Sequence, residues 1–191
     1  EIYYGYDHFE QCYRYDYDIY YSTKIGGGWS EPKRLGGYVN SDADDGVLCI
    51  TPDGNALYFV SFKENYNLDG GPFYRAEIRG DSLVNIQGLG GKLTEFWNNS
   101  DYNAYSFPDR PEEEVMLKYL SGVAVSSDEQ ELYFATDINR KYGKIDIWVS
   151  YKVDGIWTEP INLGPNINAP GAINCEPRLS LDDDVLFFSS N

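Results

Sequence analysis

The feature that most constrains the fold of this chain is an internal repeat. The motif Asp-Ile-Tyr-Tyr-Ser at 18–22 recurs as Asp-Ile-Trp-Val-Ser at 146–150, which is 128 residues later. The same offset carries Trp-Ser-Glu-Pro at 29–32 onto Trp-Thr-Glu-Pro at 157–160. Similarity at a fixed spacing is typical of proteins that stack copies of one supersecondary unit. The repeat therefore predicts an array of similar units.

Each unit predicts four short strands. A first strand ends at a Ser/Thr-x-Asp turn, and an aromatic strand follows at 57–59, 132–134 and 186–188. The Asp-Ile motif supplies a third strand, and the segment after Trp-Ser/Thr-Glu-Pro supplies a fourth. Alternating residues between turn signals favour strands, and no window shows a helical period. We expect 18–22 and 146–150 to be third strands of different sheets.

The turn after the first strand carries a recurring aspartate, namely Asp53, Asp128 and Asp182. Aspartate side chains in turns accept backbone hydrogen bonds. We therefore predict a structural role for these three carboxylates.

Composition supports a β-rich fold. Aromatic residues make up 16% of the chain and include 18 tyrosines, while 19 glycines and 9 prolines suit many tight turns. A single four-stranded sheet leaves both of its faces uncovered, and radial stacking of several such sheets solves this problem. The sequence therefore predicts an all-β protein, a β-propeller of four-stranded antiparallel blades.

At this level of detail the chain resembles the WD-like, TolB-type β-propeller repeat family. The family pattern is matched almost throughout 146–191 and well over 18–61, whereas the middle unit departs with Phe-Tyr-Arg-Ala at 73–76. Similar repeats occur in periplasmic TolB and in propeller-containing envelope lipoproteins. The resemblance implies a periplasmic, outer-membrane-associated or extracellular protein. It carries little information about function, because such repeats serve scaffolds, receptors and enzyme appendages alike.

The repeat also predicts how the chain is divided. The central aromatic residues of successive second strands are Tyr3, Tyr58, Tyr133 and Phe187, at steps of 55, 75 and 54 residues. These steps indicate blades with loop insertions. The expected strands amount to three of a first blade, all of a second and third, and two of a fourth, so we expect about three and a half blades of a six- or seven-bladed ring. The expected blades are a partial one at 1–37, complete ones at 38–94 and 95–165, and a partial one at 166–191.

Loop lengths differ between the two expected faces of the propeller. Turns between first and second strands, and between third and fourth strands, are short throughout. The insertions fall in the other connections, at 5–17, 62–72, 92–120, 137–145 and 164–175. Long loops grouped on one face of a rigid scaffold are where binding usually develops. We therefore expect this long-loop face to bind, although insertions that are merely tolerated there are the alternative.

Two stretches of these loops hold candidate ligand-binding residues. Asn40, Asp42, Asp44 and Asp45 offer the alternating oxygens that Ca²⁺ favours, but the loop lacks the glycine and glutamate of an EF-hand, so a solvated turn is the alternative. Aromatic and acidic side chains in the longest loop are candidate partner anchors, unless they pack on their own blade; these are Trp97, Tyr102, Tyr105 and Asp109.

Charge narrows the class of partner. The formal net charge is −16, and so acidic a surface repels nucleic acid. No apolar run is long enough for a membrane helix. Three cysteines, Cys12, Cys49 and Cys175, form neither a disulfide framework nor a zinc motif. We expect a noncatalytic module that binds a protein or a glycan and needs no cofactor, with Ca²⁺ as the one candidate ion.

The alternative is a glycoside-acting propeller that resembles sialidases. Those enzymes repeat an Asp box, Ser-x-Asp-x-Gly-x-Thr-Trp, at the turn between third and fourth strands. The segment 22–29 keeps the spacing of serine, glycine and tryptophan but has Lys24 in place of the aspartate. His8 is the single histidine, and no nucleophile motif lies beside it. No catalytic residue is therefore predicted.

Overall fold

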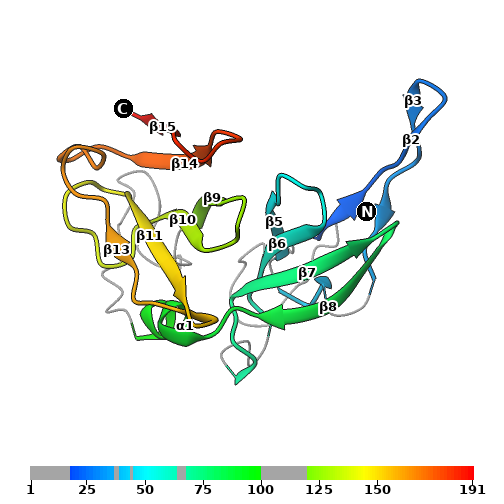
Figure 1. The fold of residues 1–191 in the computed structure, drawn as a ribbon, viewed down its shortest axis with the longest axis horizontal. Coiled ribbons are helices and arrows are strands. Elements are labelled where there is room, and N and C mark those ends of the chain that lie inside the picture. Colours follow the sequence, from blue (N-terminus) through cyan, green and yellow to red (C-terminus); the bar gives the residue numbers. More distant parts are fainter. Residues whose placement is uncertain (1–17, 37–38, 44, 64–67, 100–119) are drawn as a thin grey trace, which may run out of the picture.

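The computed structural model describes residues 18–36, 39–43, 45–63, 68–99 and 120–191 (Figure 1). These residues form mostly antiparallel β-strands, with one short helix among them. The prediction of an all-β protein is confirmed. The expectation that the chain has no helical segment was wrong, because α1 (Gly91–Asn98) lies in the predicted 92–120 insertion and begins one residue before it.

The first complete sheet is a meander of four strands. It contains β5 (Asp45–Ile50), β6 (Ala56–Ser61), β7 (Phe73–Arg79) and β8 (Ser82–Gly88), each paired with the next. The turns from β5 to β6 and from β7 to β8 are short, while the connection from β6 to β7 carries the 62–72 insertion.

The second complete sheet repeats this arrangement. It contains β9 (Leu120–Val125), β10 (Glu131–Thr136) and β11 (Asp146–Val153) in order. The outer edge of β11 pairs with two short strands, β12 (Ile156–Trp157) and β13 (Ile161–Asn162). Figure 1 shows the two sheets side by side, with α1 near their base.

Two-stranded sheets flank these on the chain. Before them, β1 (Tyr20–Tyr21) pairs with β4 (Lys33–Arg34), with the β2 (Lys24–Ile25) and β3 (Gly28–Trp29) hairpin between. After them, β14 (Asn174–Leu179) pairs with β15 (Leu186–Ser190). Strands therefore occur within both copies of the Asp-Ile motif, and they lie in different sheets, as the 128-residue offset predicts.

The apolar core lies between consecutive sheets. The central cluster joins side chains of β6 and β7, including Tyr58 and Phe73, to side chains of β10 and β11, including Phe134. A second cluster joins Ile19 and Val39 to the other side of the β5–β8 sheet. A third lies between the β9–β13 sheet and β14–β15. Each of the two complete sheets therefore buries apolar residues against both of its neighbours. In addition, β9 contacts both β5 and β14, so the first strands of successive sheets are adjacent.

An asparagine in the loop after the fourth strand recurs in the repeat, and its side chain hydrogen-bonds to the backbone of the third-strand segment. The Asn168 amide accepts a hydrogen bond from the Ile147 N–H at 2.7 Å and donates to the Ile147 carbonyl at 2.9 Å. Asn40 makes the same pair of bonds to Ile19, at 2.7 and 3.0 Å. Both side chains are buried. This pairing gives a physical reason for the asparagine that recurs 128 residues apart.

Carboxylates at one turn position tie a sheet to the preceding sheet. Glu129, in the turn between β9 and β10, accepts hydrogen bonds from Tyr58 Oη at 2.5 Å and from Arg75 Nε and Nη2 at 2.5 and 2.8 Å. Asp183, at the same position between β14 and β15, accepts from the Ser127 N–H at 2.8 Å and from its Oγ at 2.6 Å. The equivalent residue between β5 and β6 is Gly54, which has no side chain to do this.

All three residues at this turn position have a positive φ, between 56° and 74°. Glycine adopts this left-handed conformation without cost, whereas Glu129 and Asp183 adopt it at some cost. These carboxylates make an ion pair and hydrogen bonds to the preceding sheet, across the boundary that we call the seam, and these contacts offset that cost.

Replacement of Asn168 tests the repeated asparagine. Asn168→Ala leaves the buried Ile147 N–H without its partner, while the Ile147 carbonyl keeps the hydrogen bond from the Leu163 N–H at 3.1 Å. We therefore expect a loss of about 1–3 kcal/mol in the free energy of unfolding. Urea titration followed by circular dichroism measures this. Asn98→Ala, at an exposed helical position, is the control and should change the value by less than about 0.5 kcal/mol. Equal values for the two variants would contradict the assignment.

Replacement of Glu129 tests the seam between the complete sheets. Its hydrogen bonds from Arg75 lower the pKa of the Glu129 carboxyl. A lowered pKa stabilises the fold above the carboxyl's unfolded pKa, and this stabilisation is lost as the pH falls through the folded value. We expect Glu129→Gln to cost about 1–3 kcal/mol at pH 7 and to flatten the loss of stability below about pH 4. Urea titrations at pH 7 and pH 3 measure both effects, and parallel pH profiles for the two proteins would contradict the prediction.

Candidate functional site

The candidate site is built around α1, which packs between the two complete sheets. Its apolar residues Leu93, Phe96 and Trp97 follow the i, i+3, i+4 spacing and are buried together in the central cluster. Gly91 begins the helix with φ +64°, and a Cβ on it would lie 2.7 Å from the Trp157 carbonyl oxygen. Glycine is therefore needed for α1 to approach β12 this closely.

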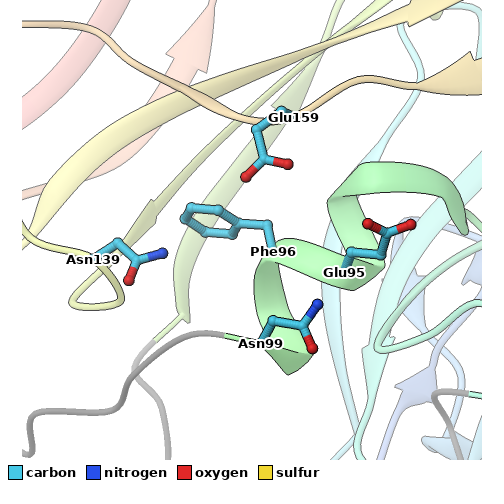
Figure 2. Close-up of a pocket in the computed structure, with 5 residues that line it drawn as sticks. All are labelled: Glu95, Phe96, Asn99, Asn139 and Glu159. Atoms are coloured by element: carbon cyan, nitrogen blue, oxygen red, sulfur yellow. The ribbon is translucent and has the colours of Figure 1, made fainter.

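A small pocket of about 140 Å³ opens beside the helix (Figure 2). The Phe96 ring, 6% exposed, forms its floor. Side-chain packing holds this ring in place, with centroids 5.0 Å from Trp148 and 6.2 Å from Phe134. Four exposed polar side chains form the rim, and Figure 2 shows them around the ring. They are Glu95, Asn99, Asn139 and Glu159.

The Asn139 wall is positioned by the loop that joins β10 to β11. Asp146, fully buried at the start of β11, accepts hydrogen bonds from three successive backbone N–H groups of this loop, at 2.7–3.0 Å. The Ile138 N–H donates to Thr136 Oγ1 at 3.2 Å. Asn139 has φ +50°, a conformation that asparagine tolerates better than most residues. The first residue of the repeated Asp-Ile motif therefore orders one side of the pocket.

The charge of the pocket is negative. Glu95 pairs with Lys92 at 2.5 Å, and this hydrogen bond raises the pKa of Lys92, with the nearby Glu159 carboxylate adding to the effect. Within the described ranges, Glu159 makes no hydrogen bond or ion pair of its own. Two carboxylates thus face one ammonium group. The pair of Lys92 and Glu95 is exposed, so it contributes little to stability and can rearrange.

The chemistry offered by this rim is hydrogen-bond acceptance and attraction of positive charge. The carboxylates accept only, while the carboxamides of Asn99 and Asn139 both donate and accept. The lining includes no hydroxyl, thiol or imidazole that could act as a nucleophile. Across the described part of the chain, no group of three or more His, Cys, Asp or Glu side chains could hold a metal ion. The geometry therefore supports binding.

The aromatic anchor predicted at Trp97 lies inside the protein. Its side chain is 1% exposed, with ring centroids 5.8 Å from Phe62 and 5.7 Å from Phe73. The alternative, packing of this stretch on its own blade, describes Trp97 only in part, because the indole is buried but its ring neighbours Phe62 and Phe73 belong to the expected 38–94 blade. Tyr102, Tyr105 and Asp109 lie outside the described residues.

The four candidate residues of the acidic loop at 40–45 differ in their environments. The Asn40 amide is engaged with Ile19 and with the Leu35 carbonyl, while Asp42 is exposed and Asp44 lies outside the described residues. Asp45 is 3% exposed; its Oδ2 accepts from the backbone N–H and Oγ of Ser41. The other oxygen of Asp45 is buried and has no hydrogen-bond partner among the described residues. Calcium binding in this loop stays a prediction.

Sequence reasoning did not select the residues that line the pocket. In the sequence, Phe96 precedes the candidate Trp97 and Glu159 belongs to the repeated Trp-Thr-Glu-Pro, but neither pattern indicates a ligand-binding role. The i, i+3, i+4 spacing of apolar residues after Gly90 and Gly91 is compatible with a short helix, but the segment is too short for this spacing to establish a helical period. No signal in the sequence links that helix to Glu159.

No protein-family model matches this chain, and a comparison with curated proteins found no match. No helix among the described residues has the length and apolarity needed to cross a membrane.

Replacement of Trp97 separates a core residue from a surface anchor. Because the indole is buried, we expect Trp97→Ala to lower the free energy of unfolding by about 3–5 kcal/mol. The matched control is Trp29→Ala, since Trp29 is 72% exposed and should cost less than about 1 kcal/mol. Urea titration measures both. A Trp97 variant as stable as the Trp29 variant would contradict the placement of Trp97 in the core.

Proposed function

We propose that this chain is a noncatalytic binding module of a secreted or cell-envelope protein, which contacts a protein or a glycan through its long-loop face. The observation that carries the proposal is the origin of the pocket. Four of its five lining residues come from two of the insertions, 92–120 and 137–145. Loops on a rigid scaffold are common binding elements. The buried phenyl floor and exposed polar rim suit recognition of a partner group.

We further propose that the sheets are blades of a β-propeller of the WD-like, TolB type. The support is topological. A meander of four strands is followed by a sheet of five strands, in which the short strands β12 and β13 both pair with β11. Apolar clusters fill the space between consecutive sheets, and the first strands β5, β9 and β14 are neighbours. A six- or seven-bladed ring would place all first strands around one axis. A periplasmic, outer-membrane-associated or extracellular location follows from this resemblance.

Charge indicates the kind of partner. With a net charge of −16 and an acidic pocket, the module favours a partner with a basic or hydrogen-bond-donating surface over nucleic acid. Attraction between opposite surface charges raises the association rate, and salt screens it. The affinity should therefore fall as ionic strength rises.

The proposal is tested by partner capture from an envelope fraction, followed by affinity measurement with variants. Glu159→Gln removes one rim charge and should weaken association about fivefold or more. Asp154→Asn, in the short turn between β11 and β12, removes one charge elsewhere and should leave the affinity unchanged. Loss of binding in Asp154→Asn but not in Glu159→Gln would place the contact away from the pocket.

The rival function is glycoside hydrolysis, which would use a pair of carboxylates. Chromogenic glycosides incubated with the purified protein test it. We expect no turnover. Turnover that disappears in Glu95→Gln or Glu159→Gln would make the pocket an active site and would overturn the noncatalytic proposal.

A further inference from the structure

We propose that the pocket beside α1 accepts one basic side chain of a protein partner, and that it prefers arginine to lysine. This inference rests on the proposed binding function and specifies the group that is recognised. It concerns Phe96 and the four polar residues of the rim.

The size of the pocket sets the size of its ligand. A volume of about 140 Å³ is well below the roughly 300–1,000 Å³ typical of sites for drug-sized ligands. It is close to the roughly 150 Å³ of an engineered cavity that binds benzene. The pocket opens to solvent and has room for one small planar group, such as the head of a side chain, but not for an oligosaccharide.

The charge of the pocket selects a cation. The Glu159 carboxylate makes no ion pair or hydrogen bond with the described residues, and Glu95 shares the single ammonium of Lys92. A bound cation would neutralise the second carboxylate charge of the rim, whereas a neutral sugar hydroxyl would not. Since the rim is exposed and the Lys92 side chain is 58% exposed, the cation can enter without displacing buried groups.

The shape of the rim favours guanidinium over ammonium. Polar side chains from three separate segments of the chain line the pocket around the Phe96 ring. Figure 2 shows the Glu159 carboxylate directed toward this ring, the amide of Asn139 on another side of it, and the Glu95 carboxylate directed away from it. A guanidinium group presents five donors in one plane, and it stacks on aromatic rings more readily than ammonium does. Lysine has three donors on one nitrogen and cannot span the rim as well.

The proposal predicts an opposing effect at Lys92. If Lys92 competes with the ligand for the rim carboxylates, its removal should strengthen binding. Lys92→Gln should therefore raise the affinity for the cation, while Glu159→Gln should lower it. A purely structural role for these residues would not produce opposite signs.

The test is a nuclear magnetic resonance titration of the ¹⁵N-labelled chain with small probes. The probes are Nα-acetyl-arginine amide, the lysine equivalent, and the citrulline equivalent, which keeps the shape of arginine but has no charge. We expect the arginine probe to shift the side-chain amide signals of Asn99 and Asn139. The lysine probe should bind more weakly, and the citrulline probe should cause no saturable shift.

The repeat provides a matched control variant. Glu31 occupies the position equivalent to Glu159 in the Trp-Ser-Glu-Pro copy and is exposed, but it does not line the pocket. We expect Glu159→Gln to weaken arginine binding about fivefold, as for an exposed ion pair, and Glu31→Gln to leave it unchanged. Unchanged dispersion of the amide spectrum establishes that both variants are folded.

Several results would overturn the proposal. Equal binding of the citrulline and arginine probes would show that charge is not recognised, and equal losses in Glu31→Gln and Glu159→Gln would show that the effect is nonspecific. Shifts of Asn99 and Asn139 with N-acetylglucosamine but not with arginine would make this a glycan pocket. If the arginine probe fails while a captured partner still depends on Glu159, the ligand assignment fails and the binding function stands. If a captured partner is insensitive to Glu159, the proposed binding face fails independently.

Discussion

Burial of both faces of each complete sheet is the constraint on which the rest of this structure depends. Ile19 and Val39 cover one face of the β5–β8 sheet, and the central cluster covers the other. In that cluster the ring centroids of Phe73 and Phe134 lie 5.6 Å apart across the seam. Apolar burial is the main favourable term in folding, so each sheet is stable only with its neighbours in place. Glu129 then adds a polar contact that orients one sheet on the next.

The same constraint creates the candidate site. The helix α1 fills part of the space between the two complete sheets with Leu93 and Trp97, both essentially inaccessible to solvent. Phe96 belongs to the same cluster, but its ring also reaches the surface where the helix, the 137–145 loop and the segment around Glu159 meet. A pocket floored by a core residue is rigid, because the ring cannot move without disturbing Trp148 and Phe134.

Local features were predictable because short-range interactions decide them. Asp128 accepts the Ser126 hydroxyl at 2.7 Å and the Gln130 N–H at 3.0 Å, and Asp53 and Asp182 make similar contacts, so the predicted structural role of the turn aspartates is confirmed. The short helix was missed. Its few apolar residues resemble the aromatic strands around them, and periodicity separates the two poorly over eight residues.

What the sequence by itself determined is the set of strands, their turns and their recurrence, since each depends on residues a few positions apart. What only the tertiary structure decided is the environment of equivalent residues. Trp157 is 1% exposed beneath α1, whereas Trp29 in the matching motif is 72% exposed. Glu159 lines the pocket and Glu31 does not, although both follow the same Trp-Ser/Thr motif. Burial and charge at a repeated position depend on which neighbouring segment packs against it, and that neighbour lies far away in the sequence.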